Sequence, residues 1–67
     1  MITVIFNDSP RLIPAEETIA GLLRELVLPE RGIAVAVNGE VVRRAKWPEH
    51  RLFDGDRIDV LTAAQGG

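Results

Sequence analysis

Apolar and polar positions along the chain divide it into five predicted strands and one helix. Residues 2–6 are mostly β-branched or aromatic and predict a strand. One face of that strand carries Ile2, Val4 and Phe6. Turn-forming residues 7–10 follow, and residues 11–13 predict a short second strand. The first two strands are therefore expected to form a hairpin.

The next segment has the spacing of an amphipathic helix. Its apolar positions follow the i, i+3, i+4, i+7 pattern and are Ile19, Leu22, Leu23 and Leu26. Thr18 is the expected N-cap, and Pro29 and Gly32 close the helical region. Gly21 weakens the helix interior by up to about 1 kcal/mol relative to alanine. Its small size favours close packing of the helix against a sheet.

A second hairpin is predicted after the helix. Ile33–Val37 is nearly all apolar, which is typical of a buried, central strand. The dipeptide Asn38-Gly39 then favours a type I′ turn, after which residues 40–42 return as the partner strand.

The last predicted strand follows an irregular stretch at residues 43–53 and an Asp-Gly-Asp turn at residues 54–56. Residues 57–62 alternate as a strand, with Ile58 and Val60 facing inward. The order β-β-α-β-β-β predicts an α+β fold, a mixed sheet of four to five strands packed on one helix. Because the helix joins a hairpin to later strands, at least one parallel pairing through a right-handed crossover is expected.

Composition narrows the classes of protein that the chain can belong to. Its 67 residues predict one domain, too small to enclose a deep pocket. The absence of cysteine excludes disulfides, thiolate zinc sites and a cysteine nucleophile. A net charge of −2 argues against general nucleic-acid binding. No apolar run approaches the roughly 20 residues of a membrane span, and the first residues do not resemble a signal peptide. We expect neither nucleic acid nor membrane as a partner.

No group of side chains has the spacing of a catalytic or metal site. His50 is the only histidine and lies in a polar stretch, where a solvated loop residue is expected. Asp54 and Asp56 flank a glycine, but a calcium loop needs roughly six or more oxygen ligands, so a turn is favoured. Trp47 is expected to cover the core at the end of the sheet, with its indole N–H donating to a carbonyl. We therefore predict no catalytic residue, no metal ligand and no enzyme.

The terminal dipeptide Gly66-Gly67 is the remaining candidate for chemistry. Glycine lacks a Cβ, so such a tail can pass through a narrow enzyme channel. Conversion of the terminal carboxylate to an acyl-adenylate would make AMP a leaving group, and attack by a sulfur nucleophile would give a thiocarboxylate. The alternatives are a frayed terminus, a truncation or a linker scar. We expect a domain at residues 1–62 and a flexible tail at residues 63–67.

Several short motifs, taken in their order and spacing, resemble one known family. They are Phe6-Asn7-Asp8, Thr18-Ile19 with Leu22-Leu23, Ala34-Val35-Ala36-Val37-Asn38, Val42-Arg43-Arg44 followed by Trp47, Asp54-Gly55-Asp56 with Ile58, and Gly66-Gly67. Over essentially its whole length the chain resembles the ThiS family, the sulfur carriers of bacterial thiamine biosynthesis within the ubiquitin-like β-grasp superfamily. Each motif alone is common, and the specificity comes from their order.

The resemblance implies a fold, and it implies that partner enzymes carry out the chemistry on the tail of this chain. The first and last strands would lie adjacent and parallel at the centre of the sheet. A ubiquitin-activating-type (ThiF-like) enzyme would use ATP to adenylate Gly67, and a cysteine persulfide would supply the sulfur. A thiazole synthase (ThiG-like) would receive the tail, of which Gly66 and Gly67 are the functional residues and need no processing. The carrier itself would bind no cofactor and would act in the cytoplasm.

Other carriers stay open at this point. Molybdopterin carriers share the fold and the terminal glycines but are usually longer, and other small carriers serve cysteine, tungsten-cofactor or tRNA pathways. A β-grasp interaction module with incidental glycines is the alternative from another class. The segment Ala63-Ala64-Gln65 is small and polar where such carriers often have larger apolar residues, so the docking of the tail is left open.

The partner surface is predicted on the sheet face that leads into the tail. One helix cannot cover both faces of a sheet with nearly all-apolar strands, and an uncovered apolar patch usually marks an interface. We expect Leu61, Val35 and Val37 on this surface, with Arg43 or Arg44 at its rim. The basic cluster of Arg43, Arg44 and Lys46 is otherwise a solvated face or a docking patch for an acidic partner.

Overall fold

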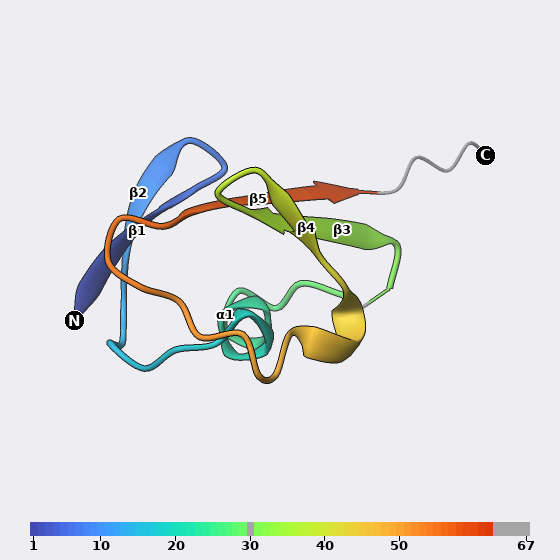
Figure 1. Ribbon diagram of the computed structural model, residues 1–67, viewed down its shortest axis with the longest axis horizontal. Helices are drawn as coiled ribbons and strands as arrows, with labels where there is room; N and C mark the ends of the chain where they lie inside the picture. The colour runs from blue at the N-terminus through green and yellow to red at the C-terminus, as the bar shows by residue number, and fades with distance from the viewer. Residues whose placement is uncertain (30, 63–67) are drawn as a thin grey trace.

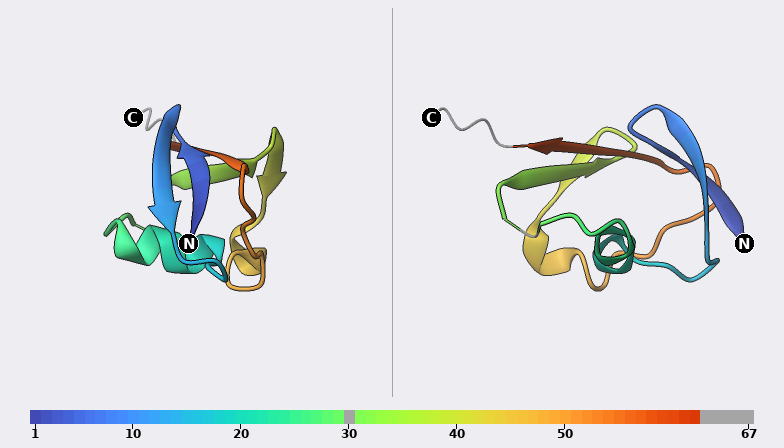
Figure 2. Two further views of the ribbon diagram at one scale, coloured as in Figure 1. Left: turned by 90° about the vertical axis from the view of Figure 1, so that its left-hand side faces the viewer. Right: turned by 180° about the vertical axis from the view of Figure 1, so that it is seen from behind.

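A five-stranded mixed sheet packs on one helix in the computed structural model, which describes residues 1–29 and 31–62 (Figure 1). The elements are β1 (Ile2–Phe6), β2 (Ser9–Ile13), α1 (Ile19–Glu25), β3 (Ile33–Val37), β4 (Glu40–Val42), a 3₁₀ turn (Arg44–Lys46) and β5 (Arg57–Thr62). Figures 1 and 2 show α1, the 3₁₀ turn and the connection to β5 on the same side of the sheet. The predicted α+β class and the element order are confirmed.

Strand β5 lies in the middle of the sheet, whose order is β2-β1-β5-β3-β4. It pairs in parallel with β1 and antiparallel with β3. The parallel pairing of the first and last strands is therefore confirmed. Strand β3 lies between β5 and β4, so it is interior as predicted, but the central position belongs to β5.

Both hairpins close through two-residue turns in the left-handed region. Asn38 and Gly39 have φ angles of 52° and 87°, which confirms the predicted type I′ turn. In the first hairpin Asn7 and Asp8 have φ angles of 47° and 71°. The turn is therefore shorter than the four residues predicted from the sequence. Strand β2 accordingly begins at Ser9, where it pairs with Phe6.

Helix α1 begins at the predicted cap. The Thr18 side chain accepts a hydrogen bond from the Gly21 N–H at 3.2 Å. Gly21 does not pack against the sheet as expected. A Cβ added at Gly21 would collide with the Glu17 carboxylate, because this side of the helix faces the capping residues.

The helix ends in a Schellman arrangement. The Leu28 N–H donates to the Leu23 carbonyl at 2.9 Å, and the Val27 N–H donates to the Arg24 carbonyl at 3.1 Å. This closure places Val27 at a φ of 56°, a position that glycine usually occupies.

The core lies between α1 and the sheet face turned toward it. Its buried members are Val4, Ile13, Ile19, Leu22, Leu23, Val35, Val37, Trp47, Leu52 and Ile58. Trp47 closes this core beside the helix, and its indole N–H donates to the Val42 carbonyl at 2.8 Å, as predicted. The irregular stretch before β5 is fixed to the start of α1, because the Ile19 N–H donates to the His50 carbonyl and the Leu52 N–H donates to the Glu17 carbonyl.

Candidate functional site

The sequence-predicted tail residues Gln65, Gly66 and Gly67 lie outside the described residues. The structure does describe β5, the strand that leads to them, as far as Thr62. Strand β5 is paired with β1 at Arg57 and Ile58 and with β3 from Ile58 to Thr62, so its first part is held on both sides and its last part by β3. The sequence therefore places the terminal glycines after the middle strand of the sheet, separated from its end by three residues.

The sheet face opposite α1, called here the outer face, carries small and apolar side chains beside the end of β5. Leu61 is 66% exposed there and pairs with Ala34 of β3. On the neighbouring strand pair Ala36 lies opposite Val41, which is also exposed. These four side chains share one face because paired residues of adjacent strands point to the same side.

Val35 and Val37 lie on the other face, which corrects the predicted partner surface. Their side chains are 0% and 6% exposed and belong to the core under α1. The reason is the alternation along β3, in which the valines point toward the helix and Ala34 and Ala36 point outward. Leu61 keeps its predicted exposure, and Ala34, Ala36 and Val41 replace the two valines beside it.

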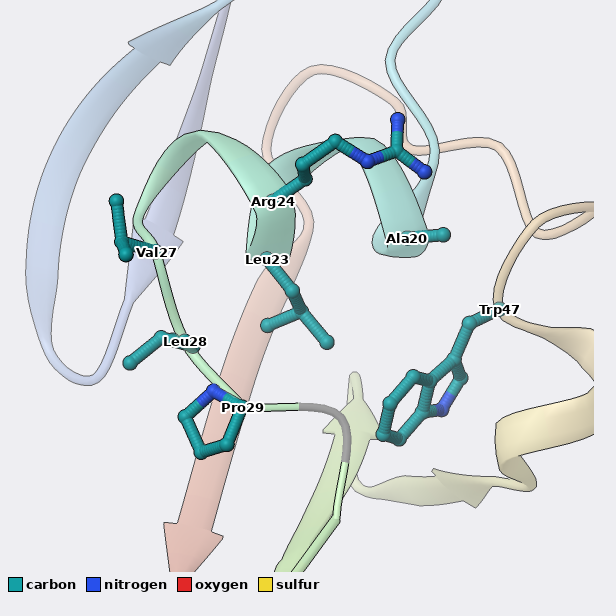
Figure 3. A pocket seen from close by; sticks show the side chains of 7 residues that line it. All are labelled: Ala20, Leu23, Arg24, Val27, Leu28, Pro29 and Trp47. Atoms are coloured by element: carbon teal, nitrogen blue, oxygen red, sulfur yellow. The ribbon is translucent and has the colours of Figure 1, made fainter.

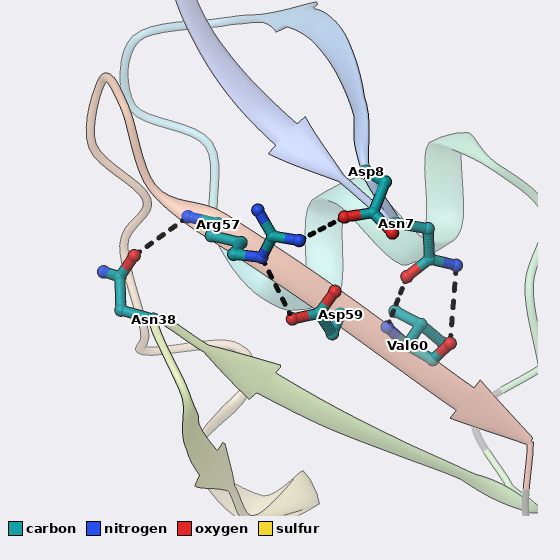
Figure 4. A network of polar contacts seen from close by, with 6 residues as sticks. All are labelled: Asn7, Asp8, Asn38, Arg57, Asp59 and Val60. Carbon is teal, nitrogen blue, oxygen red and sulfur yellow. Dashed lines mark hydrogen bonds and ion pairs between the residues drawn. The ribbon is translucent and has the colours of Figure 1, made fainter.

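A clamp formed by Asn7 extends the pairing of β5 beyond the end of β1. The Asn7 side chain accepts from the Val60 N–H at 2.8 Å and donates to the Val60 carbonyl at 3.4 Å (Figure 4). The amide thus continues the ladder one step after the backbone of β1 turns away into its hairpin. Sequence reasoning missed this residue because its partner lies 53 positions away.

The second hairpin turn holds the other end of β5. The Asn38 carboxamide oxygen accepts from the Arg57 N–H at 2.9 Å, while its amide group donates to Asp56 at 3.0 Å. The Arg57 side chain pairs with Asp8 and lies 3.7 Å from Asp59 (Figure 4). Both hairpin turns therefore use an asparagine to fix the strand that leads to the tail.

Arg43 and Arg44 point to different surroundings, although they are neighbours in sequence. Both are exposed. Arg43 borders a shallow hollow that also includes Val41, next to the outer-face residues. Arg44 borders a hollow with Ala20 and Trp47 on the helix side. Only Arg43 is therefore close to the predicted partner surface.

The aspartates of the predicted turn are structural. Asp54 accepts from the Thr3 N–H at 2.8 Å, and Asp56 accepts from the Phe53 N–H at 2.9 Å. His50 is half-buried in the connection before β5. Within residues 1–29 and 31–62, no group of three or more histidine, cysteine or acidic side chains is arranged to hold a metal ion. In the same part of the chain, no helix has the length and apolar character needed to cross a membrane.

Known proteins share both the sequence pattern and the fold. The ThiS family model matches residues 4–67. The sulfur carrier protein ThiS of Escherichia coli is 34% identical over 64 residues, which cover 96% of this chain and 97% of that protein. A crystal structure of the thiamine biosynthesis protein ThiS from Geobacter metallireducens superimposes with a TM-score of 0.86 at 25% identity, covering 98% of this chain and all of that one.

A further match joins the chain to a larger protein. A thiazole synthase of Paramagnetospirillum magneticum is 30% identical over 64 residues, which cover 96% of this chain but 20% of the synthase. The fold, with its central terminal strand, defines a β-grasp domain of the carrier type. The chain belongs to the ThiS family.

Proposed function

We propose that this protein is a sulfur carrier of thiamine biosynthesis and that the carboxylate of Gly67 carries the sulfur. The observation that supports this most strongly is that the family match extends through residue 67 and so includes both terminal glycines. The E. coli relative, of nearly the same length, is named as a sulfur carrier protein. The chain is a carrier and not an enzyme, and its own side chains take no part in bond making.

The chemistry belongs to the terminal carboxylate and to partner enzymes. A carboxylate is a poor electrophile because its charge is delocalised, so an adenylating enzyme first joins it to AMP, using ATP and releasing pyrophosphate. The terminal sulfur of a cysteine persulfide then displaces AMP. A second thiol then attacks the cysteine sulfur of the resulting acyl disulfide, so that a disulfide forms between these two sulfurs and the thiocarboxylate is left on Gly67. These steps take place in the cytoplasm in our proposal.

The recipient of the sulfur is proposed to be a thiazole synthase. The P. magneticum synthase that includes a segment similar to this chain supports the assignment, because carrier-like and synthase sequence occur there in one polypeptide. A thiamine pathway is therefore favoured over molybdopterin or other carrier pathways, which remain outcomes of the test below.

The partners are proposed to bind the outer face beside the end of β5. This surface consists of Leu61, Ala34, Ala36 and Val41, with Arg43 at its rim. Small side chains at the two alanines allow a partner to approach the sheet backbone closely. The position of this surface beside the last strand lets one enzyme hold the domain and the tail together.

The test is the intact mass of the protein after incubation with ATP, the thiamine-pathway adenylating enzyme and a sulfur source. We expect a mass gain equal to the exchange of one oxygen for sulfur. A variant that lacks Gly67 should keep its fold and show no gain, because a chain end contributes little to stability. No gain in the full chain, with an enzyme that activates another carrier, would overturn the thiamine assignment. Gain with a molybdopterin-pathway enzyme instead would identify the alternative carrier.

A further inference from the structure

The helix side of the molecule has a groove, apolar in its larger part and polar in its smaller part, that the proposed sulfur chemistry does not use. It is called here the helix-side groove and combines two adjoining hollows of about 480 Å³ and 310 Å³, which share Ala20 and Trp47. The larger hollow is lined by Ala20, Leu23, Arg24, Val27, Leu28, Pro29 and Trp47 (Figure 3). Figure 3 shows the Leu23 and Trp47 side chains extending into the space between the end of α1 and the 3₁₀ turn.

Val27, beside this groove, has a backbone conformation and a side-chain exposure that are both energetically unfavourable when no partner is bound. Its φ of 56° is an outlier for a β-branched residue, since the left-handed region brings Cβ close to the following carbonyl. Its side chain is also 87% exposed, so it gains almost nothing from burial. A backbone outlier of this kind supports a functional hypothesis when a ligand could compensate for it. Contact of Val27 with a partner would provide that compensation.

The charged side chains among the described residues that line the groove are all basic, although the chain as a whole has a net charge of −2. Arg24 borders the larger hollow, and Arg31 and Arg44 border the smaller one. The described residues that line the two hollows include these three guanidinium groups and no carboxylate. Neither ion pair found among the described residues involves any of the three.

We propose that the helix-side groove docks an acidic segment of a partner protein, with an apolar side chain of that segment against Val27 and Leu28 and its carboxylates on the arginines. Guanidinium groups form strong, charge-assisted hydrogen bonds with carboxylates, and the apolar lining needs an apolar anchor. A second copy of this chain fits poorly, because a two-fold contact would bring the same three arginines face to face. This surface is distinct from the outer face and does not depend on the proposed sulfur transfer.

Trp47 provides a direct readout of the groove because it is the only tryptophan. The probe is a short synthetic peptide without aromatic residues, in which leucines are flanked by glutamates. We expect a saturable change in Trp47 emission as this peptide is added, with binding that weakens as salt increases. The matched peptide with glutamine in place of each glutamate should bind roughly tenfold more weakly.

Val27→Gly separates binding from folding because the two effects have opposite signs. Glycine accepts the φ of Val27 without strain, so this variant should melt at a higher temperature than the wild type. It should also bind the acidic peptide roughly tenfold more weakly, because the apolar contact is lost. Leu12→Ala, which truncates an exposed leucine of the edge strand β2, is the control and should bind the acidic peptide as the wild type does. Arg24→Gln should weaken binding and reduce its dependence on salt.

Results of three kinds would overturn the proposal. The first is the absence of a saturable Trp47 response to the acidic peptide. The second is equal affinity of the wild type and Val27→Gly, or equal affinity of the two peptides. The third is self-association in sedimentation that Val27→Gly abolishes, since this would make a second copy the occupant. The outcome is independent of the mass test on Gly67, because peptide binding needs neither ATP nor the tail.

Discussion

Among residues 1–29 and 31–62, four non-glycine residues have positive φ angles, and only one of these four has a side chain unsuited to that region. Asn7, Asp8 and Asn38 are of the types that tolerate the left-handed conformation, and all three form hairpin turns. Val27 is β-branched and stands where a Schellman closure usually has glycine. The fold therefore keeps a local strain at the end of α1 that a single substitution removes.

Replacing Val27 with glycine is predicted to stabilise the domain. The left-handed conformation costs roughly 1–2 kcal/mol for a residue with a Cβ. Glycine regains most of this and loses part of it through the larger entropy of its unfolded state. We expect the free energy of unfolding to rise by about 1 kcal/mol, measured by urea denaturation followed through Trp47 fluorescence.

Val27→Ala is the matched comparison for this measurement. Alanine removes the branched side chain but keeps the Cβ that causes the strain, so its gain should be clearly smaller than that of glycine. Equal stability of Val27→Gly and the wild type would show that the φ of Val27 is not a source of strain.

At the scale of elements, β5 is fixed by the turns of the two hairpins as well as by its neighbours. Asn7 holds Val60 at one end, and Asn38 holds Arg57 at the other. Each asparagine thus has two tasks, because its backbone closes a turn in the left-handed region while its side chain binds the strand. The strand that leads to the tail is consequently tied at Val60, where its pairing with β1 has ended, and at Arg57, where its pairing with β3 has ended.

Asn7→Gly tests the clamp separately from the turn. Glycine adopts the φ of 47° easily but has no amide to bind Val60. Of the two hydrogen bonds lost, the one donated by the Val60 N–H, worth about 1 kcal/mol, should decide the result, and its loss should accelerate hydrogen exchange of the Val60 amide several-fold. Asp8→Gly changes the next turn residue and should leave the exchange of Val60 near the wild-type rate. Similar rates in the two variants would refute the role of Asn7 as a clamp.

The sequence predicts local elements of this fold better than long-range contacts. The dipeptide Asn38-Gly39 and the spacing from Ile19 to Leu26 depend on neighbouring residues, so turn and helix were found directly. The Asn7 clamp needs β1 and β5 to be paired first, which no local pattern shows. The face of Ile33–Val37 was ambiguous because all five residues are apolar. The size of the side chains distinguishes the two faces of this strand, since the larger valines face the helix and the alanines face outward.

At the scale of the whole molecule, α1 and the connection before β5 cover one sheet face and leave the outer face exposed among the described residues. The outer face includes two leucines of nearly equal exposure, Leu61 at 66% and Leu12 at 65%. Leu61 lies on the central strand close to the tail, whereas Leu12 lies on the edge strand β2. The two positions therefore offer a matched pair for testing where partners bind.

Leu61→Glu is predicted to leave the fold intact and to slow sulfur loading of the tail by tenfold or more, to about the extent seen for central interface residues. Leu12→Glu should load close to the wild-type rate. Both substitutions are at exposed sites and should change stability by no more than about 0.5 kcal/mol, which thermal unfolding can verify. Loading is followed by intact mass over time with the adenylating enzyme limiting.

If both variants load equally well, the partner does not use the outer face near β5. If both load equally poorly, the contact extends across the whole sheet to β2, and the surface around Leu61 is only one part of it.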